Sequence, residues 1–191
     1  GTFVMGFDEE YPPMGFVDEK GDHVGFDIDL AKEVTSRLGV ELVLQPIAWD
    51  SKELELSGKN IDCIWSGLTM TPERIEQMTF SIPYLANEQI LVVRSDSGIA
   101  SEADLSGKVL GTQAGSSSVD VLNANPDLLA AFSQPAVHPD RRSVRRLAGI
   151  IHRAAHGHRQ RNVILHLLET PLVSVEEIVD RLHLLLGAAR K

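Results

Sequence analysis

The sequence predicts an α/β fold with a mostly parallel sheet, because strand-like and helix-like stretches alternate along its first half. Residues 2–7 and 40–44 are short apolar runs typical of strands. Between them, residues 28–38 place their apolar side chains on one helical face, and Gly39 follows as a stop signal. Strand, helix and strand in this order form the βαβ unit from which parallel sheets are built.

The alternation continues along the chain. We expect a polar hairpin at 17–22, a second helix at 49–56, a buried strand at 61–65 and a third helix ending near residue 78. The following stretches predict an apolar strand at 89–93, a capped helical turn at 101–105, a strand at 108–113 and a helix at 119–123. Two prolines within residues 135–139 predict a break in regular structure.

Residues 66–74 join the predicted strand at 61–65 to the next helix. Thr71 suits the N-cap position, and Pro72 suits the first helical position. A helix N-terminus offers backbone N–H groups and a positive dipole end to an anion, and Arg74 adds a permanent positive charge one turn later. This junction could therefore bind a carboxylate. The alternative is a capped surface helix with a solvated arginine.

A second junction of this kind follows the predicted strand at 108–113. Small residues at 114–118 lead into the next helix, which gives a second set of backbone N–H groups for an anion. In open α/β sheets, ligands bind beyond the carboxyl ends of the strands, where both junctions lie. The alternative is a tight loop between a strand and a helix without a ligand.

Composition separates the chain into two parts. Of its 191 residues, 1–134 hold 8 Lys and Arg against 22 Asp and Glu, whereas 135–191 hold 10 against 5. The first part is acidic and the second is basic. No run of about 18 apolar residues predicts a membrane span. Cys63 is the single cysteine and is expected to be a buried small apolar residue. The start at Gly1 suggests a signal peptide that was removed or was never present.

Several motifs in combination identify residues 1–133 as resembling family 3 of the extracellular solute-binding proteins, which carry polar amino acids for ABC transporters and have the type 2 periplasmic-binding-protein fold. The motifs occur in the family's order and stand at residues 11–13, 25–30, 61–67, 69–74, 80–84, 105–109 and 115–116. The resemblance implies two α/β lobes that close on an amino acid by a hinge motion.

The resemblance also implies roles for ten residues. Arg74 would pair with the ligand's α-carboxylate, helped by Thr69 and by the second junction at Ser116, Ser117 and Ser118. Ser66 and Gly67 would accept the α-ammonium. The remaining three would surround the ligand's side chain: Asp8, Tyr11 and Trp49. For Asp8 the alternative is a solvated acid in an acidic loop, and for Trp49 it is a core aromatic.

The implied protein is a ligand-binding component and not an enzyme. It would work with the transmembrane permease subunits of an ABC transporter, in the periplasm or outside the cell, with a possible lipid anchor on the native precursor. We expect no cofactor, no metal and no nucleic-acid partner. Two alternatives stay open: an enzyme of the dehydratase type on the same fold, whose catalytic carboxylates are not identifiable here, and a chimeric protein with a DNA-binding tail.

The resemblance ends near residue 134. We expect lobe 1 at 1–94, the hinge and the start of a truncated lobe 2 at 95–134, and a basic helical segment at 135–191. That segment could be a frameshift or fusion product, a small helical domain resembling helix-turn-helix proteins, or a substitute for the rest of lobe 2. Three of its histidines, His152, His156 and His158, have spacings found in metal sites. Because no cysteine and no helical His-Glu motif accompanies them, we expect solvated histidines instead.

Overall fold

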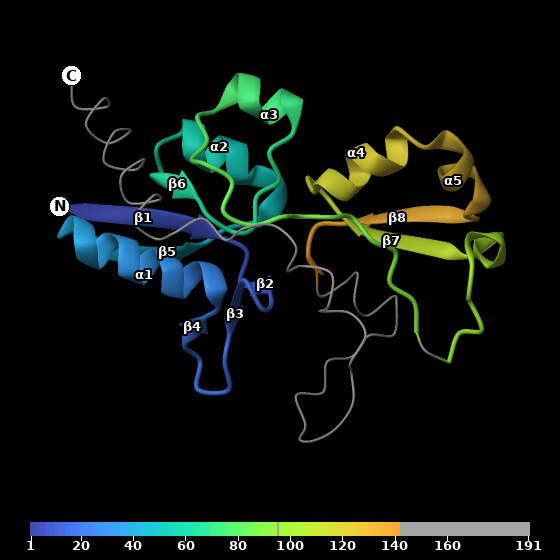
Figure 1. Ribbon diagram of the computed structural model, residues 1–191, viewed down its shortest axis with the longest axis horizontal. Coiled ribbons are helices and arrows are strands. Elements are labelled where there is room, and N and C mark those ends of the chain that lie inside the picture. The colour runs from blue at the N-terminus through green and yellow to red at the C-terminus, as the bar shows by residue number, and fades with distance from the viewer. Residues whose placement is uncertain (95, 142–191) are drawn as a thin grey trace. The chain divides into compact units, whose positions relative to one another are not determined.

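The computed structural model describes residues 1–94 and 96–141, which form two compact units (Figure 1). The first unit contains residues 1–47 and 54–88, and the second contains 48–53 and the described part of 89–141. The predicted basic helical segment at 135–191 lies outside the described residues from 142 onward, and this part includes its three histidines. Within its described part the prediction of a helix is wrong, because Gln134–His138 form a strand. Across the part that is described, no helix has the length and apolar character needed to cross a membrane.

A three-stranded parallel sheet forms the centre of the first unit. Strand β1 (Thr2–Phe7) lies between β5 (Glu41–Pro46) and β6 (Cys63–Ile64), in the order β5-β1-β6. The predicted alternation of strand, helix and strand is therefore confirmed. The strand expected at 61–65 is shorter than predicted, because only Cys63 and Ile64 pair with β1.

Helix α1 (Phe26–Leu38) runs along one face of this sheet (Figure 1). It ends where Gly39 adopts a left-handed conformation with φ 66°, which costs glycine little because it has no Cβ. The buried side chains of the helix and sheet form one apolar core, made by Met5, Phe7, Ile28, Ala31, Val34 and Trp65. The predicted helical face is thus confirmed as the buried face.

A small antiparallel sheet follows β1. Its strands are β2 (Glu10–Tyr11), β3 (Gly15–Val17) and β4 (His23–Val24), and the last two form the hairpin predicted around residues 17–22. The helix predicted at 49–56 divides into a 3₁₀ turn, η1 (Trp49–Ser51), and helix α2 (Lys52–Ser57). Helices often begin with such a turn. Helix α3 (Pro72–Gln77) begins where the sequence predicts it.

The second unit contains a two-stranded parallel sheet with helices α4 and α5 on one side (Figure 1). Its elements are η2 (Glu102–Leu105), β7 (Val109–Gln113), α4 (Ser117–Asn123), α5 (Pro126–Ala131) and β8 (Gln134–His138). The break predicted at 135–139 is wrong, because β8 runs through it. Within the described residues β8 has a partner on one side only, and an edge strand tolerates proline because its outer backbone groups form no ladder hydrogen bonds.

The strand predicted at 89–93 is also wrong. These residues have no regular secondary structure, and the side chains of Ile90 and Val92 are 61% and 50% exposed. Their composition favours an extended chain, but a strand exists only where another strand accepts its hydrogen bonds. No strand in the described part of the chain pairs with them.

Candidate functional site

Two strand ends meet in the first unit. Strands β1 and β6 are parallel neighbours, so their carboxyl ends lie at the same edge of the sheet. Asp8 follows β1 and Ser66 follows β6, and the Asp8 backbone N–H donates to the Ser66 hydroxyl at 3.2 Å. Both residues are buried. Strands β5 and β6 follow β1 in the sequence and lie on opposite sides of it, so the strand order reverses at β1. Open α/β sheets bind ligands beyond the carboxyl ends of the strands at such a point.

Asp8 is held firmly at this edge. Its side chain is 6% exposed, and its Oδ1 accepts the backbone N–H of Glu10 at 2.9 Å. The alternative of a solvated acid in an acidic loop does not fit this burial. A buried carboxylate at a strand end can fix a cationic or hydrogen-bond-donating group.

Tyr11 lies directly over Gly67. A Cβ atom at Gly67 would come within 3.1 Å of the Tyr11 ring, and the residue has φ 55°. The close approach and the left-handed conformation both require glycine here. The Ser66–Gly67 turn therefore presents its backbone beside the Tyr11 ring.

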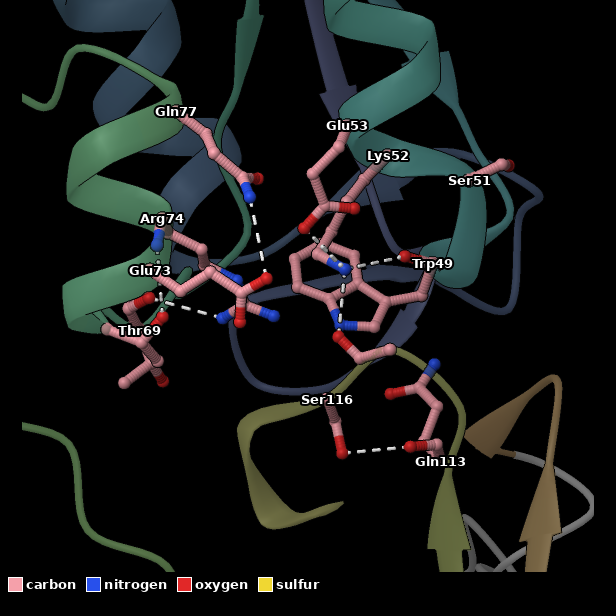
Figure 2. Close-up of polar contacts among 12 residues, drawn as sticks. Trp49, Ser51, Lys52, Glu53, Thr69, Glu73, Arg74, Gln77, Gln113 and Ser116 are labelled. Atoms are coloured by element: carbon pink, nitrogen blue, oxygen red, sulfur yellow. Dashed lines mark hydrogen bonds and ion pairs between the residues drawn. The ribbon is translucent and has the colours of Figure 1, made fainter. Parts of the chain in front are cut away.

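Arg74 and Thr69 come together at the start of α3 (Figure 2). The Thr71 hydroxyl caps the helix by accepting the Arg74 backbone N–H at 3.3 Å. The Arg74 guanidinium is 8% exposed and donates to the Thr69 carbonyl at 3.2 Å. The alternative of a solvated surface arginine does not fit this burial. Asn87 Nδ2 donates to the Thr69 hydroxyl at 2.5 Å, a contact between residues 18 positions apart.

A buried acid, Asp27, accepts a hydrogen bond from the backbone of the Ser66–Gly67 turn. Asp27 has no exposed surface, and its Oδ1 accepts the Tyr84 hydroxyl at 2.7 Å. Burial raises the pKa of Asp27 to about 6, although the hydrogen bonds from Tyr84 and from the Gly67 backbone act in the opposite direction. Burial and the neighbouring Asp27 hold the pKa of Tyr84 well above its ordinary value.

The second unit carries the other predicted residues. Ser116 stands at the N-cap position of α4 without a side-chain capping bond. Its hydroxyl donates to the Gln113 carbonyl at 2.9 Å, and Ser116 and Ser118 share a short hydrogen bond. The Ser118 hydroxyl also pairs with Thr112 on β7 at 2.6 Å. Gln89 Nε2 donates to the Ser117 hydroxyl at 3.1 Å. Hydrogen bonds between hydroxyl groups therefore hold the small-residue turn at the end of β7.

Trp49 lies in the second unit beside Lys52 (Figure 2). The Lys52 Nζ stands 5.0 Å from the centroid of the Trp49 ring, which is within the range of a cation–π interaction. Trp49 is 6% exposed, as the core-aromatic alternative also predicts.

Within each unit, the structure brings the predicted residues together. Asp8, Tyr11, Ser66 and Gly67 form one cluster, and Thr69 pairs with Arg74. The sequence reading missed four residues that support these clusters: Asp27, Lys52, Asn87 and Gln89. Of these, Asp27 lies within the family motif at 25–30, and a charged residue on the apolar face of a predicted helix is a signal for it.

No group of metal ligands exists among residues 1–94 and 96–141. Cys63 is held in β6, and burial raises the pKa of its thiol well above the ordinary value, with Asp62 acting in the same direction. A raised pKa disfavours the thiolate, which is the reactive form of cysteine.

The sequence model of the bacterial extracellular solute-binding proteins, family 3, matches residues 3–145. The chain belongs to this family. The match extends about a dozen residues beyond residue 133, where the predicted resemblance ends, and it includes β8. Family 3 therefore accounts for almost all of the described chain.

Relatives of the chain within the family bind amino acids, as their names state. The arginine-binding extracellular protein ArtP of Bacillus subtilis is 40% identical over 114 residues, which cover 59% of this chain and 44% of ArtP. The L-cystine-binding protein TcyJ of Escherichia coli is 34% identical over 127 residues, or 65% of this chain and 48% of TcyJ. The chain spans about half the length of these curated relatives.

A solved structure confirms the fold as that of a periplasmic-binding-protein lobe. An ABC uptake transporter substrate-binding protein from Streptococcus pneumoniae, with bound histidine, has a TM-score of 0.73 and 40% identity, over 78% of this chain and 62% of that one. One similar protein is an enzyme: cyclohexadienyl dehydratase of Pseudomonas aeruginosa is 36% identical over 76 residues, which cover 40% of this chain and 28% of the enzyme.

Proposed function

We propose that the chain captures a polar α-amino acid as the solute-binding component of an ABC uptake transporter, in the periplasm or outside the cell. The observation that carries the proposal is the buried Arg74 beside Thr69, on the same unit as the Asp8–Ser66 strand ends. A zwitterion needs a cationic partner at one end and neutral or anionic acceptors at the other. The first unit supplies both.

The roles follow from the chemistry of each group. The Arg74 guanidinium can bind a carboxylate with two parallel N–H donors, and the Thr69 hydroxyl can add a third hydrogen bond. The Ser66 hydroxyl and the Gly67 carbonyl accept from the α-ammonium, Tyr11 covers the ligand's side chain, and Asp8 selects a side chain that is cationic or donates hydrogen bonds.

The residues of the second unit belong to the same proposal. Backbone N–H groups in the turn of Ser116, Ser117 and Ser118 would also bind the carboxylate, and Trp49 would offer an aromatic face to the ligand's side chain. The transmembrane permease subunits would be the partner of the loaded protein. A lipid anchor on the precursor would keep it near the membrane.

A panel of free amino acids tests this proposal. Calorimetry and thermal denaturation would be run with arginine, histidine and cystine, which are named for the relatives, and with leucine and glutamate as contrasts. At a ligand concentration of 100 times Kd, a binder gains about 2.7 kcal/mol of stability, so its melting temperature must rise. The absence of heat and of a melting shift with every amino acid would overturn the proposal.

The dehydratase relative motivates a second reading, in which the same residues bind a substrate carboxylate before an elimination reaction. We propose binding without catalysis, because most of the similar proteins above are named as binding proteins. Recovery of the bound amino acid unchanged after long incubation supports this view. Turnover of a cyclohexadienyl acid by the purified chain would contradict it.

A further inference from the structure

One buried charge in the second unit has no role in the proposed binding of the ligand. Lys52 begins helix α2, and its side chain is only 1% exposed. Lysine is almost never fully buried unless its charge is paired, because removing an ammonium group from water costs free energy. The contacts of Lys52 therefore need an explanation.

The ammonium group of Lys52 has three N–H donors, and acceptors surround it. Its Nζ donates to the carbonyl of Trp49 at 3.1 Å and to the carbonyl of Gly115 at 2.8 Å. It also forms an ion pair with Glu53 at 3.0 Å. Figure 2 shows these contacts radiating from one nitrogen atom.

The Gly115 contact joins segments that are 63 positions apart in the sequence. Gly115 opens the turn that leads to Ser116, Ser117 and Ser118. A Cβ atom at Gly115 would lie 3.1 Å from the Lys52 Nζ and 3.0 Å from the Asp50 Cα, and the residue has φ 66°. The two segments thus meet so closely that only glycine fits.

We propose that Lys52 is a positioning residue that fixes the turn at Gly115 and the ring of Trp49 to one another. This proposal rests on the proposed function, since Trp49 is one of the predicted ligand-binding residues and Gly115 directly precedes three others, at 116–118. One ammonium group holds a backbone carbonyl of each, and its charge faces the Trp49 ring. Lys52 itself does not contact the ligand.

The first arm of the test needs no ligand. In the full chain, Lys52→Met keeps the length of the side chain but removes its charge and its donors. We expect the backbone amides of residues 114–119 to exchange hydrogen at least about tenfold faster, while those of β1 are unchanged. Wild-type exchange at 114–119 in the variant would overturn the proposal.

The second arm measures amino-acid affinity by calorimetry at a temperature where every variant is folded. We expect Lys52→Met to weaken binding about tenfold. Glu53→Gln keeps both carbonyl contacts and should change affinity less than about threefold. Val34→Ala removes buried apolar volume from α1 in the first unit and is the control for lost stability alone. An equal loss of affinity in Val34→Ala would reduce Lys52 to a stability role and contradict the proposal.

A double-mutant cycle gives a further check. Gly115→Ala disturbs the same contact from the opposite side, so the double variant should bind no more weakly than the weaker single variant. Additive losses would show that the two residues act independently and would overturn the proposal. If the wild-type chain binds no amino acid, the proposed function fails, and the hydrogen-exchange arm alone still decides whether Lys52 positions the turn.

Discussion

In the first unit, β1 has a partner strand on each side and its residues Met5 and Phe7 have no exposed surface, whereas β7 in the second unit pairs with β8 alone. Within the described residues, Val109 and Val137 on that pair are more than half exposed. A two-stranded sheet is marginally stable without further packing. The first unit therefore holds its candidate binding residues on a packed core, while the second depends more on individual polar contacts.

The largest expected effect tests the difference in packing. Phe7→Ala should lower the free energy of unfolding by about 4 kcal/mol, because it opens a cavity in a closed core. Phe132→Ala in the second unit should lower the free energy of unfolding by only about 2 kcal/mol. The second unit has a two-stranded sheet, so neighbouring side chains can move into the space left by the ring. Urea denaturation would be followed by fluorescence. Trp65 reports on the first unit in a Trp49→Phe background, and Trp49 reports on the second in a Trp65→Phe background. Equal losses would remove the contrast between the units.

The next effect concerns the buried acid of the first unit. The folded-state pKa of Asp27 is raised from 3.8 to about 6, so the folded protein binds a proton more tightly than the unfolded chain. Stability from this group is fully present below pH 4 and is lost as the pH rises through 6. At 1.36 kcal/mol per pH unit, the loss is about 3 kcal/mol.

Asp27→Asn removes this titration but keeps an acceptor for Tyr84. The variant should match the wild type at pH 4 and be more stable by up to about 3 kcal/mol at pH 8, in urea denaturation at each pH. Asp29→Asn, an exposed acid on the same helix, should show no such trend. A difference between Asp27→Asn and the wild type that does not vary with pH would contradict the raised pKa.

A smaller effect tests the candidate binding residues of the first unit. Arg74→Gln should weaken amino-acid binding about 30-fold, or about 2 kcal/mol, because it removes charge-assisted hydrogen bonds to the carboxylate. Arg37→Gln is the matched control, since that arginine is exposed and pairs with Glu33 at 2.7 Å on α1. Calorimetry on both variants decides. Wild-type affinity in Arg74→Gln would exclude the arginine from the site.

The smallest effect compares two helix caps, one in each unit. Thr71→Ala and Ser101→Ala should each cost about 1 kcal/mol of stability. Thr71 caps the turn that carries Arg74, so its loss should also weaken ligand binding severalfold. Ser101 pairs with Asp104 at an exposed turn of the second unit, and its loss should leave affinity unchanged. The two variants would be compared by thermal denaturation and calorimetry. If Ser101→Ala weakened binding as much, the cap would have no specific link to the site.

Much of the candidate site could be predicted because short-range chemistry places it. The Thr71 cap and the proline after it start α3 and put Arg74 in its first turn, whatever lies around them. Gly39 ends α1 for a local reason as well, since it takes the left-handed conformation readily. The motifs shared with family 3 then supplied the remaining roles, and the match over residues 3–145 confirmed the family.

The supporting residues could not be predicted, because their roles depend on partners that are distant in sequence. Asp27 meets Tyr84 across 57 positions, and Asn87 meets Thr69 across 18. Neither spacing follows a helical or strand period. Lys52 lies in a charged stretch that resembles any solvated helix start. Its contact with the Gly115 carbonyl spans 63 positions and cannot be read from that stretch.

The sequence by itself determined the order of elements, the helix ends and the family, because capping, glycine conformation and apolar periodicity act over a few residues. Tertiary structure decided which extended segments became strands. Residues 89–93 have the composition of a strand and no partner among the described residues, whereas β8 contains Pro135 and still pairs with β7 over five positions. A strand is stabilised by hydrogen bonds to another segment, so its own residues cannot determine whether it forms.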